Sequence, residues 1–513
     1  MTEGTPNGWQ SSTGQESDAA QVRRAARGST LNLAGAGISA IASFGLTALV
    51  TRADSQAVAG VFFSATSLFV LLVAIGQLGT TNGLVFFPAR AQAIGHPDRT
   101  RHYIRAALIP VVCFSMLMSV ALFMLASQVS SIISPNHRGL AAESVRVLAV
   151  FVPFATTGLA LLAATRGLGT MRANVAIEQI LRPGLQIAIM AVIVALGLRL
   201  NQVWAWGIPY SVACVVAMLW LRRLLSRESK SRSPAKVMQE FWRYTAPRSG
   251  VSLAQVAMQR LDIVLVGAIA GAPEAALYTA ATRFVVLGQM ARNAVSQAIE
   301  PHLAAALTNG QRGTVNHLYQ VSTAWLMAVS WPVYLVMLVA APVMLQIFGQ
   351  DYVVATDVLS ILATAMLVAT FCGDVDVILL MSGRGSWTLI NIGVALALNL
   401  GIDLWLIPKI GITGAALGWA VAIVVKCLSA LIQVGLVMRI HPVARGTILV
   451  GAISVVSFGG VLGVVRAVFS PDLLPMLLGA TVACGVYAAL IWRARDQIEL
   501  GAFLAAPLRR VKN

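Results

Sequence analysis

Seven ionisable side chains lie inside segments that are otherwise apolar, and they are the residues of this sequence best suited to chemistry. They are four cations and three anions: Arg260, Asp262, Arg283, Arg292, Asp374, Asp376 and Lys426. A charge at the centre of a membrane-spanning helix costs about 2.5–3.5 kcal/mol, so such residues usually face a partner or a cavity. Guanidinium groups around a cavity can hold a phosphate or diphosphate through charge-assisted bonds. The pattern predicts either an anion-binding cavity or internal salt bridges that fix helix packing.

The positions of these charges along their segments favour different roles. Arg260 and Asp262 fall in the middle of one segment and are two residues apart. On a helix their side chains point roughly 160° from each other. We therefore expect one to line a cavity and the other to tie its helix to a neighbour. Arg292, Asp374 and Asp376 lie nearer segment ends, where salt bridges or snorkelling toward the surface are the more common explanation.

The elements that must position these side chains are membrane-spanning helices. Of the 513 residues, 58% are hydrophobic and only 11% are charged, whereas a soluble domain carries about 25% charged residues. This composition excludes a soluble enzyme and a disordered chain. Backbone that faces lipid must be helical or in a closed barrel. Hydropathy predicts an all-α polytopic membrane protein with about fourteen spans, near residues 30–50, 57–79, 104–126, 145–164, 178–198, 203–221, 249–270, 276–299, 323–346, 356–380, 386–407, 411–437, 446–468 and 474–492.

The basic residues indicate the orientation of the spans. The chain has a net charge of +17. With the N-terminus inside, 26 Lys and Arg residues fall on inner connections and tails and 6 on outer ones. Because short cytoplasmic loops are enriched in Lys and Arg, both termini are predicted to be cytoplasmic. The basic residues are spread over connections and not gathered on one domain, so the sequence predicts no nucleic-acid partner.

A basic connection after the sixth span divides the chain. Small-residue turns recur on either side of it, as at Gly167 and Gly383, at an offset of 216 residues. Such duplication is typical of transporters built from two parallel repeats. We predict the following parts: a disordered cytoplasmic tail at 1–27, a six-helix bundle at 28–221, a basic cytoplasmic linker at 222–248, a second six-helix bundle at 249–437, two further helices at 438–492 and a basic cytoplasmic tail at 493–513.

Enzyme signatures are missing from the sequence. It contains no phosphate-binding loop, no HExxH, no spaced Cys and His set and no GxSxG, which are the motifs that would indicate nucleotide, metal or nucleophile chemistry. We therefore predict no catalytic residue, no metal site and no cofactor. Any energy would come from an H⁺ or Na⁺ gradient, the membrane potential or the gradient of the substrate.

Several motifs resemble the polysaccharide-transporter branch of the multidrug/oligosaccharidyl-lipid/polysaccharide flippase superfamily, the Wzx-type flippases. They include Tyr244 to Pro247, Arg260 to Asp262 and Leu277 to Ala281. Residues Leu406 to Ala416 are the most specific part. The resemblance covers roughly residues 28–437. The first span has no internal charge, unlike that of the related peptidoglycan-precursor flippases, which argues against lipid II as the substrate.

The resemblance implies a MATE-like architecture of two six-helix bundles around a central cavity, with two additional C-terminal helices. It implies alternating access, which would move a polyprenyl-diphosphate-linked oligosaccharide from the inner to the outer leaflet of the cytoplasmic membrane for cell-surface polysaccharide assembly. The partners would be this lipid-linked glycan, the bilayer and other proteins of envelope glycan assembly. The residues that would bind the substrate are Arg260, Arg283, Arg292 and Lys426, and those for ion coupling or salt bridges are Asp262, Asp374 and Asp376.

Three alternatives stay open at this point. A drug/cation antiporter of the same superfamily would have mainly acidic residues in its cavity. A membrane glycan polymerase or ligase would usually have a large outer loop, and the outer connections here are short. A scaffold for glycan assembly is the third alternative.

Overall fold

The computed structural model describes residues 34–94, 99–197, 201–225, 234–469 and 473–498. The expected tail at 1–27, and the part of the expected C-terminal tail beyond residue 498, lie outside this description. The described elements after the first helix, Ala34–Ala53, are α2 (Gln56–Gly76), α3 (Thr80–Ala93), α4 (Thr100–Met124), α5 (Ala126–Ile133), the 3-10 helix η2 (Pro135–His137), α6 (Arg138–Gly167), the π-helix η3 (Asn174–Leu181), α7 (Arg182–Ala195), α8 (Val203–Leu224), α9 (Pro234–Ile269), α10 (Ala272–Thr308), α11 (Arg312–Leu345), the 3-10 helix η4 (Gln350–Ala355), α12 (Thr356–Phe371), α13 (Val375–Met381), α14 (Gly385–Ile410), α15 (Ile412–Met438), α16 (Arg445–Ser454), the π-helix η5 (Val455–Gly460), α17 (Val461–Val468) and α18 (Leu473–Arg493).

The prediction of an all-helical, multi-pass membrane protein is confirmed. Thirteen helices in the described part of the chain are long and apolar enough to cross a membrane, and each coincides with an expected span. The remaining expected span, 276–299, falls within α10, which is long enough at 37 residues. Its sequence includes Glu274, Arg283 and Arg292, which lower its hydropathy below that of the other spans.

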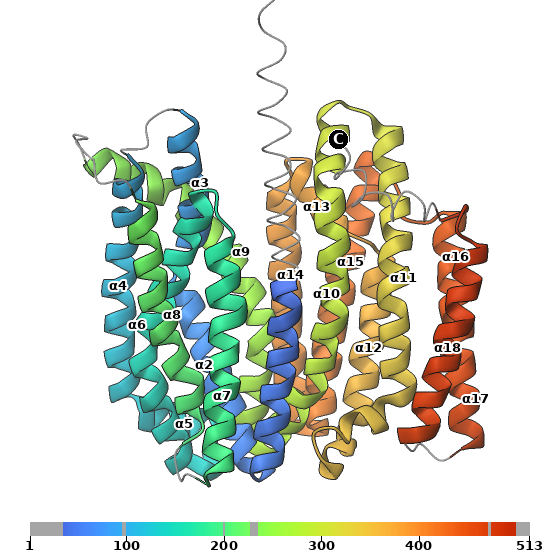
Figure 1. Ribbon diagram of the computed structural model, residues 1–513, viewed down its shortest axis with the longest axis horizontal. Coiled ribbons are helices and arrows are strands. Elements are labelled where there is room, and N and C mark those ends of the chain that lie inside the picture. Colours follow the sequence, from blue (N-terminus) through green and yellow to red (C-terminus); the bar gives the residue numbers. More distant parts are fainter. Residues whose placement is uncertain (1–33, 95–98, 198–200, 226–233, 470–472, 499–513) are drawn as a thin grey trace, which may run out of the picture.

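The helices form two groups and a smaller set at one edge (Figure 1). The group α2 to α8 occupies one side, α10 to α15 the other, and α16 to α18 stand at the far edge beside α11. Two helices connect the groups, because α2 packs against α9 and α10, and α9 also contacts α3, α4 and α14. The two groups are thus joined along α2 and α9.

The expected linker 222–248 is partly helical in the structure. α8 continues to Leu224, and α9 begins at Pro234, well before the span that hydropathy predicts. Phe241 is fully buried, with its ring 5.6 Å from that of Phe87 on α3. Glu240 accepts hydrogen bonds from Arg90 at 2.9 Å and Tyr103 at 2.8 Å. Because this segment is rich in charged residues, hydropathy did not predict its amphipathic helical start. The apolar side of this helical part packs on the first group.

The two groups meet closely at one end of the molecule, where the first helix connects to α2. The sequence predicts that this is the outer end. A Cβ atom at Gly60 would lie 1.6 Å from the carbonyl oxygen of Ala272, so only glycine allows α2 to approach α10 here. Arg52 donates from Nε to the carbonyl oxygen of Ile347 at 2.8 Å. Below this contact, the ring of Phe44 lies 5.0 Å from that of Phe348. Backbone, polar and aromatic contacts therefore close this end.

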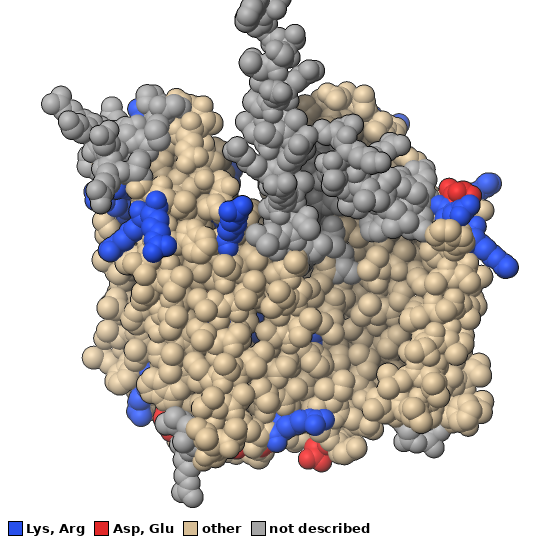
Figure 2. All heavy atoms as spheres, viewed as in Figure 1, with Lys and Arg blue, Asp and Glu red and all other residues tan. Residues whose placement is uncertain are grey.

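The surface matches a protein embedded in lipid. Figure 2 shows Lys and Arg side chains along the upper edge, fewer along the lower edge, and a broad belt with very little charged surface between them. Large apolar side chains of the spans are exposed, as at Leu117 (67%) and Met124 (74%) on α4. Exposed apolar patches of this extent favour contact with a membrane.

Candidate functional site

A cavity of about 600 Å³ lies between the two groups of helices. Its walls come from the first helix, α2, η3, α7 and α8 on one side and from α9 and α10 on the other. Its lining residues reach Ala36, Gln77 and Met290, which lie toward the helix ends that carry the predicted cytoplasmic connections. The opposite end is closed by the Gly60 and Phe348 contacts described above. The cavity therefore extends from the middle of the molecule toward the predicted inner side.

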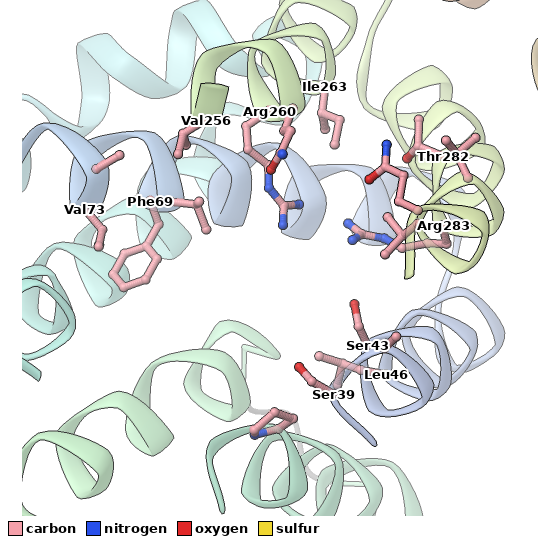
Figure 3. Close-up of a pocket in the computed structure, with 18 of the residues that line it drawn as sticks. Ser39, Ser43, Leu46, Phe69, Val73, Val256, Arg260, Ile263, Thr282 and Arg283 are labelled. Carbon is pink, nitrogen blue, oxygen red and sulfur yellow. The ribbon is translucent and has the colours of Figure 1, made fainter. Parts of the chain in front are cut away.

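Two predicted cations, Arg260 and Arg283, point into this cavity from α9 and α10 (Figure 3). The hydroxyl groups of Ser39 and Ser43 face the same space from the first helix. The two guanidinium groups face the same space, and like charges repel each other. Within the described residues neither makes an ion pair or a hydrogen bond, and Nε of Arg283 is buried without an acceptor. Two unpaired cations with adjacent hydroxyls can bind an anion.

The opposite wall holds a cation that is already paired. Arg182, at the start of α7, contacts Glu178 on η3 at 2.8 Å. It also donates to Gln186 at 3.0 Å and lies 5.0 Å from the centre of the Tyr210 ring. η3 is a π-helix, a distortion that is frequent at functional sites. The charge of Arg182 is therefore balanced within its own wall.

Asp262 is turned away from Arg260, toward a buried polar cluster on α9, α10 and α14. Its Oδ2 accepts a hydrogen bond from Tyr278 at 3.0 Å, and it faces Asp403 and Asn399. Asn399 donates to Asp403 at 3.1 Å. Asp262 is 3% exposed and Asp403 is fully buried. Three oxygens of the cluster, one each from Asp262, Asn399 and Asp403, have no donor in the described structure.

Two buried carboxyl groups that face each other cannot both be ionised without a large cost. A proton shared between them, or a bound cation, would remove this cost. The cluster can thus bind a proton or a small cation beside the cavity. Asp403 and Asn399 are not among the residues predicted from the sequence, although a signal was present. They are an intramembrane Asp and Asn four residues apart in the expected span 386–407, and so share one helix face.

The other four predicted charges lie together, apart from the residues that line the cavity. Arg292 on α10 contacts Asp374 at 2.9 Å and Asp376 at 3.9 Å. Lys426 on α15 contacts Asp376 at 2.9 Å. Ser296 also donates to Asp374. This cluster contains two cations and two anions, so its charges balance, and it ties α10 to the α12–α13 junction and to α15. The structure thus brings Arg260 and Arg283 together and places Arg292 and Lys426 elsewhere.

Two family models match parts of the chain. The model of a family described as polysaccharide biosynthesis protein matches residues 25–307. The MatE family model matches residues 247–405. No curated protein sequence matches the chain.

Solved structures share the fold at low sequence identity. The chain is similar to the lipid II flippase MurJ in an inward closed conformation, with a TM-score of 0.73 and 12% identity over 91% of this chain and 99% of that one. It is also similar to an inward-facing multidrug resistance MATE transporter, with a TM-score of 0.65 and 16% identity over 78% and 94%. A third similar structure is a MOP superfamily transporter from Pyrococcus furiosus, with a TM-score of 0.54 and 16% identity over 82% and 96%.

Proposed function

The chain belongs to the polysaccharide biosynthesis protein family and has the fold of MurJ and MATE transporters, and on this basis we propose that it translocates a polyprenyl-diphosphate-linked oligosaccharide across the membrane. The observation that carries the proposal is the pair of unpaired arginines, Arg260 and Arg283, inside a cavity between the two groups of helices. Maintaining two unpaired cations in such a place is costly unless an anion binds there.

The shape of the cavity supports the entry of such a substrate from one side. The two groups of helices are closed at the predicted outer end through Arg52, Phe348 and Gly60. The cavity extends toward the predicted inner end. On the face that Figure 2 shows, the upper edge carries more Lys and Arg side chains than the lower edge. This difference supports the predicted cytoplasmic placement of the termini. We propose that the head group enters from the cytoplasmic side and leaves after the outer contacts open.

The Asp262–Asp403 cluster is the proposed coupling site. It lies on α9 and α14, and Asp262 shares α9 with the cavity cation Arg260. A proton or Na⁺ bound there would change the packing of α9 against α10 and α14. A ligand shifts a conformational equilibrium only if it binds the inward-open and outward-open states with different affinity. Release of the ion after the outer contacts open would therefore favour the return to the inward-open state. We propose no resident metal or cofactor.

The proposal is tested by depleting the protein in its native host and measuring the sidedness of lipid-linked glycans. Complete precursor should accumulate on the inner face. Arg260→Gln and Arg283→Gln should fail to restore export, while Arg312→Gln, at an exposed position on α11, should restore it. Normal sidedness with altered drug tolerance would contradict the proposal and favour a cation antiporter. Shortened glycans on the outer face would contradict it in favour of a polymerase or ligase.

A further inference from the structure

We propose that the edge helices, α16 to α18, hold α11 in a bent form, with Tyr487 and Arg466 as positioning residues that satisfy backbone groups where α11 is interrupted. The bent α11 in turn fixes where α10 presents Arg283 to the cavity. The edge helices lie outside the two six-helix bundles that the sequence predicts, and their role is to shape the cavity wall. The bend does not depend on which ligand the cavity binds.

The backbone of α11 is interrupted at two points along its 34 residues. Pro332 has no N–H, so the carbonyl oxygen of Ala328 loses the hydrogen bond that a continuous helix would give it. Further along, Ala340 has non-helical backbone angles (φ −100°, ψ 15°), and Pro342 follows two residues later. Prolines are a common cause of sharp kinks in helices. In the interior of a membrane, carbonyl groups at such interruptions need a donor from another part of the protein.

The edge helices supply a hydrogen-bond donor at each of these two points. The hydroxyl group of Tyr487 on α18 donates to the carbonyl oxygen of Ala328 at 2.7 Å. The guanidinium group of Arg466 on α17 donates at 3.0 Å to the carbonyl oxygen of Val339, the residue directly before the kink. Donors from two different helices therefore meet the two interrupted points of one helix. This match indicates that the edge helices complete the backbone hydrogen bonding of α11.

Apolar packing covers the same part of α11. Leu335 belongs to one buried cluster with Phe458 of η5 and Leu462 of α17. Ala340, at the kink, belongs to another with Met476 of α18. The π-helix η5, which interrupts the edge helices, contacts α11 directly. The edge helices thus follow the bent course of α11 through packing as well as through hydrogen bonds.

The bent segment also contacts α10, which carries a cavity cation. Tyr334, two residues after Pro332, is fully buried. A Cβ atom at Gly288 would lie 2.3 Å from the Tyr334 ring, so α10 rests directly on this ring. Gly288 is only five residues from Arg283 on α10. A change in the course of α11 at Tyr334 would therefore displace the part of α10 that presents Arg283.

A double-mutant cycle tests the hydrogen bond of Tyr487. Tyr487→Phe removes only the hydroxyl group, and we expect the unfolding temperature of the purified full-length chain in detergent to fall by about 2 °C. Pro332→Ala restores an N–H to α11, so the carbonyl oxygen of Ala328 regains a donor within its own helix. In the Pro332→Ala background, Tyr487→Phe should therefore lower the unfolding temperature by less than half as much. An equal loss in both backgrounds would overturn the inference.

The first group of helices offers a matched control for this cycle. Tyr103→Phe removes one hydrogen bond, to Glu240 at 2.8 Å, at a site far from α11 in the sequence. It should lower the unfolding temperature equally with and without Pro332→Ala. If the Tyr103 and Tyr487 substitutions respond alike to Pro332→Ala, the hydroxyl group of Tyr487 does not complete the backbone of α11 and the inference is overturned.

Distances between spin labels test the effect on α10. The labels are placed at Ala93→Cys on α3 and Ala305→Cys on α10, both at exposed positions, in a chain whose two exposed native cysteines are replaced by serine. Arg466→Met removes the donor to α11, and we expect the distance distribution in nanodiscs to shift and broaden. Arg466→Lys keeps a donor and should restore the native distribution. An unchanged distribution in Arg466→Met would overturn the inference.

The outcomes separate this inference from the proposed function, because neither measurement uses the lipid-linked substrate. A cycle without coupling, or unchanged distances, overturns the role of the edge helices while the proposed function stands. Normal sidedness of lipid-linked glycans after depletion overturns the proposed function and leaves the bend untouched. Should Pro332→Ala fail to fold, the distances in Arg466→Met and Arg466→Lys still decide.

Discussion

Arg283 and Arg292 stand nine residues apart on the same helix, α10, yet only Arg292 has an acidic partner. Arg292 contacts Asp374 at 2.9 Å, whereas Arg283 points into the cavity with its Nε unsatisfied. Two identical side chains on one helix therefore differ in their energetic role. Arg292 is paired within the fold, whereas an unpaired buried cation such as Arg283 is costly, a cost that the proposed ligand would offset.

Replacing a cavity arginine should reduce binding without reducing stability. Arg283→Gln removes an unpaired buried cation, so we expect the unfolding temperature in detergent to stay the same or rise. Affinity for a farnesyl diphosphate that carries N-acetylglucosamine, the diphosphate lipid of these tests, should fall about tenfold or more. Arg283→Lys keeps the charge but loses the planar guanidinium group. Its affinity for the diphosphate lipid should therefore lie between those of the native chain and of Arg283→Gln. A marked loss of stability in Arg283→Gln would show that this residue is structural.

Replacing Arg292 should have the opposite effect. Arg292→Gln leaves Asp374 with Ser296 as its remaining donor in the described structure, so the free energy of unfolding should fall by about 2 kcal/mol, the contribution of a hydrogen bond to a charged group. Binding of the diphosphate lipid to the folded fraction should be unchanged. The measurements are thermal unfolding and a binding titration on the same preparation. Lower affinity at unchanged stability would place Arg292 with the substrate-binding residues.

The Asp262–Asp403 cluster should respond to ions. We expect the unfolding temperature of the native chain to rise with Na⁺ at constant ionic strength, or to fall as the pH rises if the ligand is a proton, because either ligand binds only the folded pair. Asp403→Asn should abolish this response. Asp357→Asn, at an exposed position of α12, serves as the matched control. A response that survives in Asp403→Asn would exclude the cluster as the coupling site.

The contact between α2 and α10 should tolerate no side chain. Gly60→Ala places a methyl group 1.6 Å from the carbonyl oxygen of Ala272 in the present geometry, so the helices must separate, at a cost of about 1–3 kcal/mol. Gly250→Ala on α9 meets no atom within 4 Å and should be neutral or slightly stabilising. Thermal unfolding of the two variants provides the test. Equal stability would mean that the outer contact can relax freely.

Hydropathy predicted most of the fold because lipid imposes length and apolarity on every exposed span. It did not predict the helical start of α9, since Phe241 is buried against α3 by tertiary packing. At the site, the sequence identified the charges but not their partners. Position along the span favoured a salt bridge for Arg292, but only the spatial arrangement identifies Asp374 as its partner. Asp403 was overlooked because a single carboxylate barely lowers the hydropathy of a 26-residue helix.

The polarity of α10 also constrains how the protein is made. Each span is judged for entry into the bilayer partly by its own sequence, and centrally placed Arg residues oppose entry. α10 carries Arg283 and Arg292 and falls outside the helices that are apolar enough by themselves. We therefore expect it to enter the membrane together with α9 and α11, which pack against it. We therefore expect insertion of the second group of helices to be cooperative, and variants that neutralise Arg283 to insert more readily than the native chain.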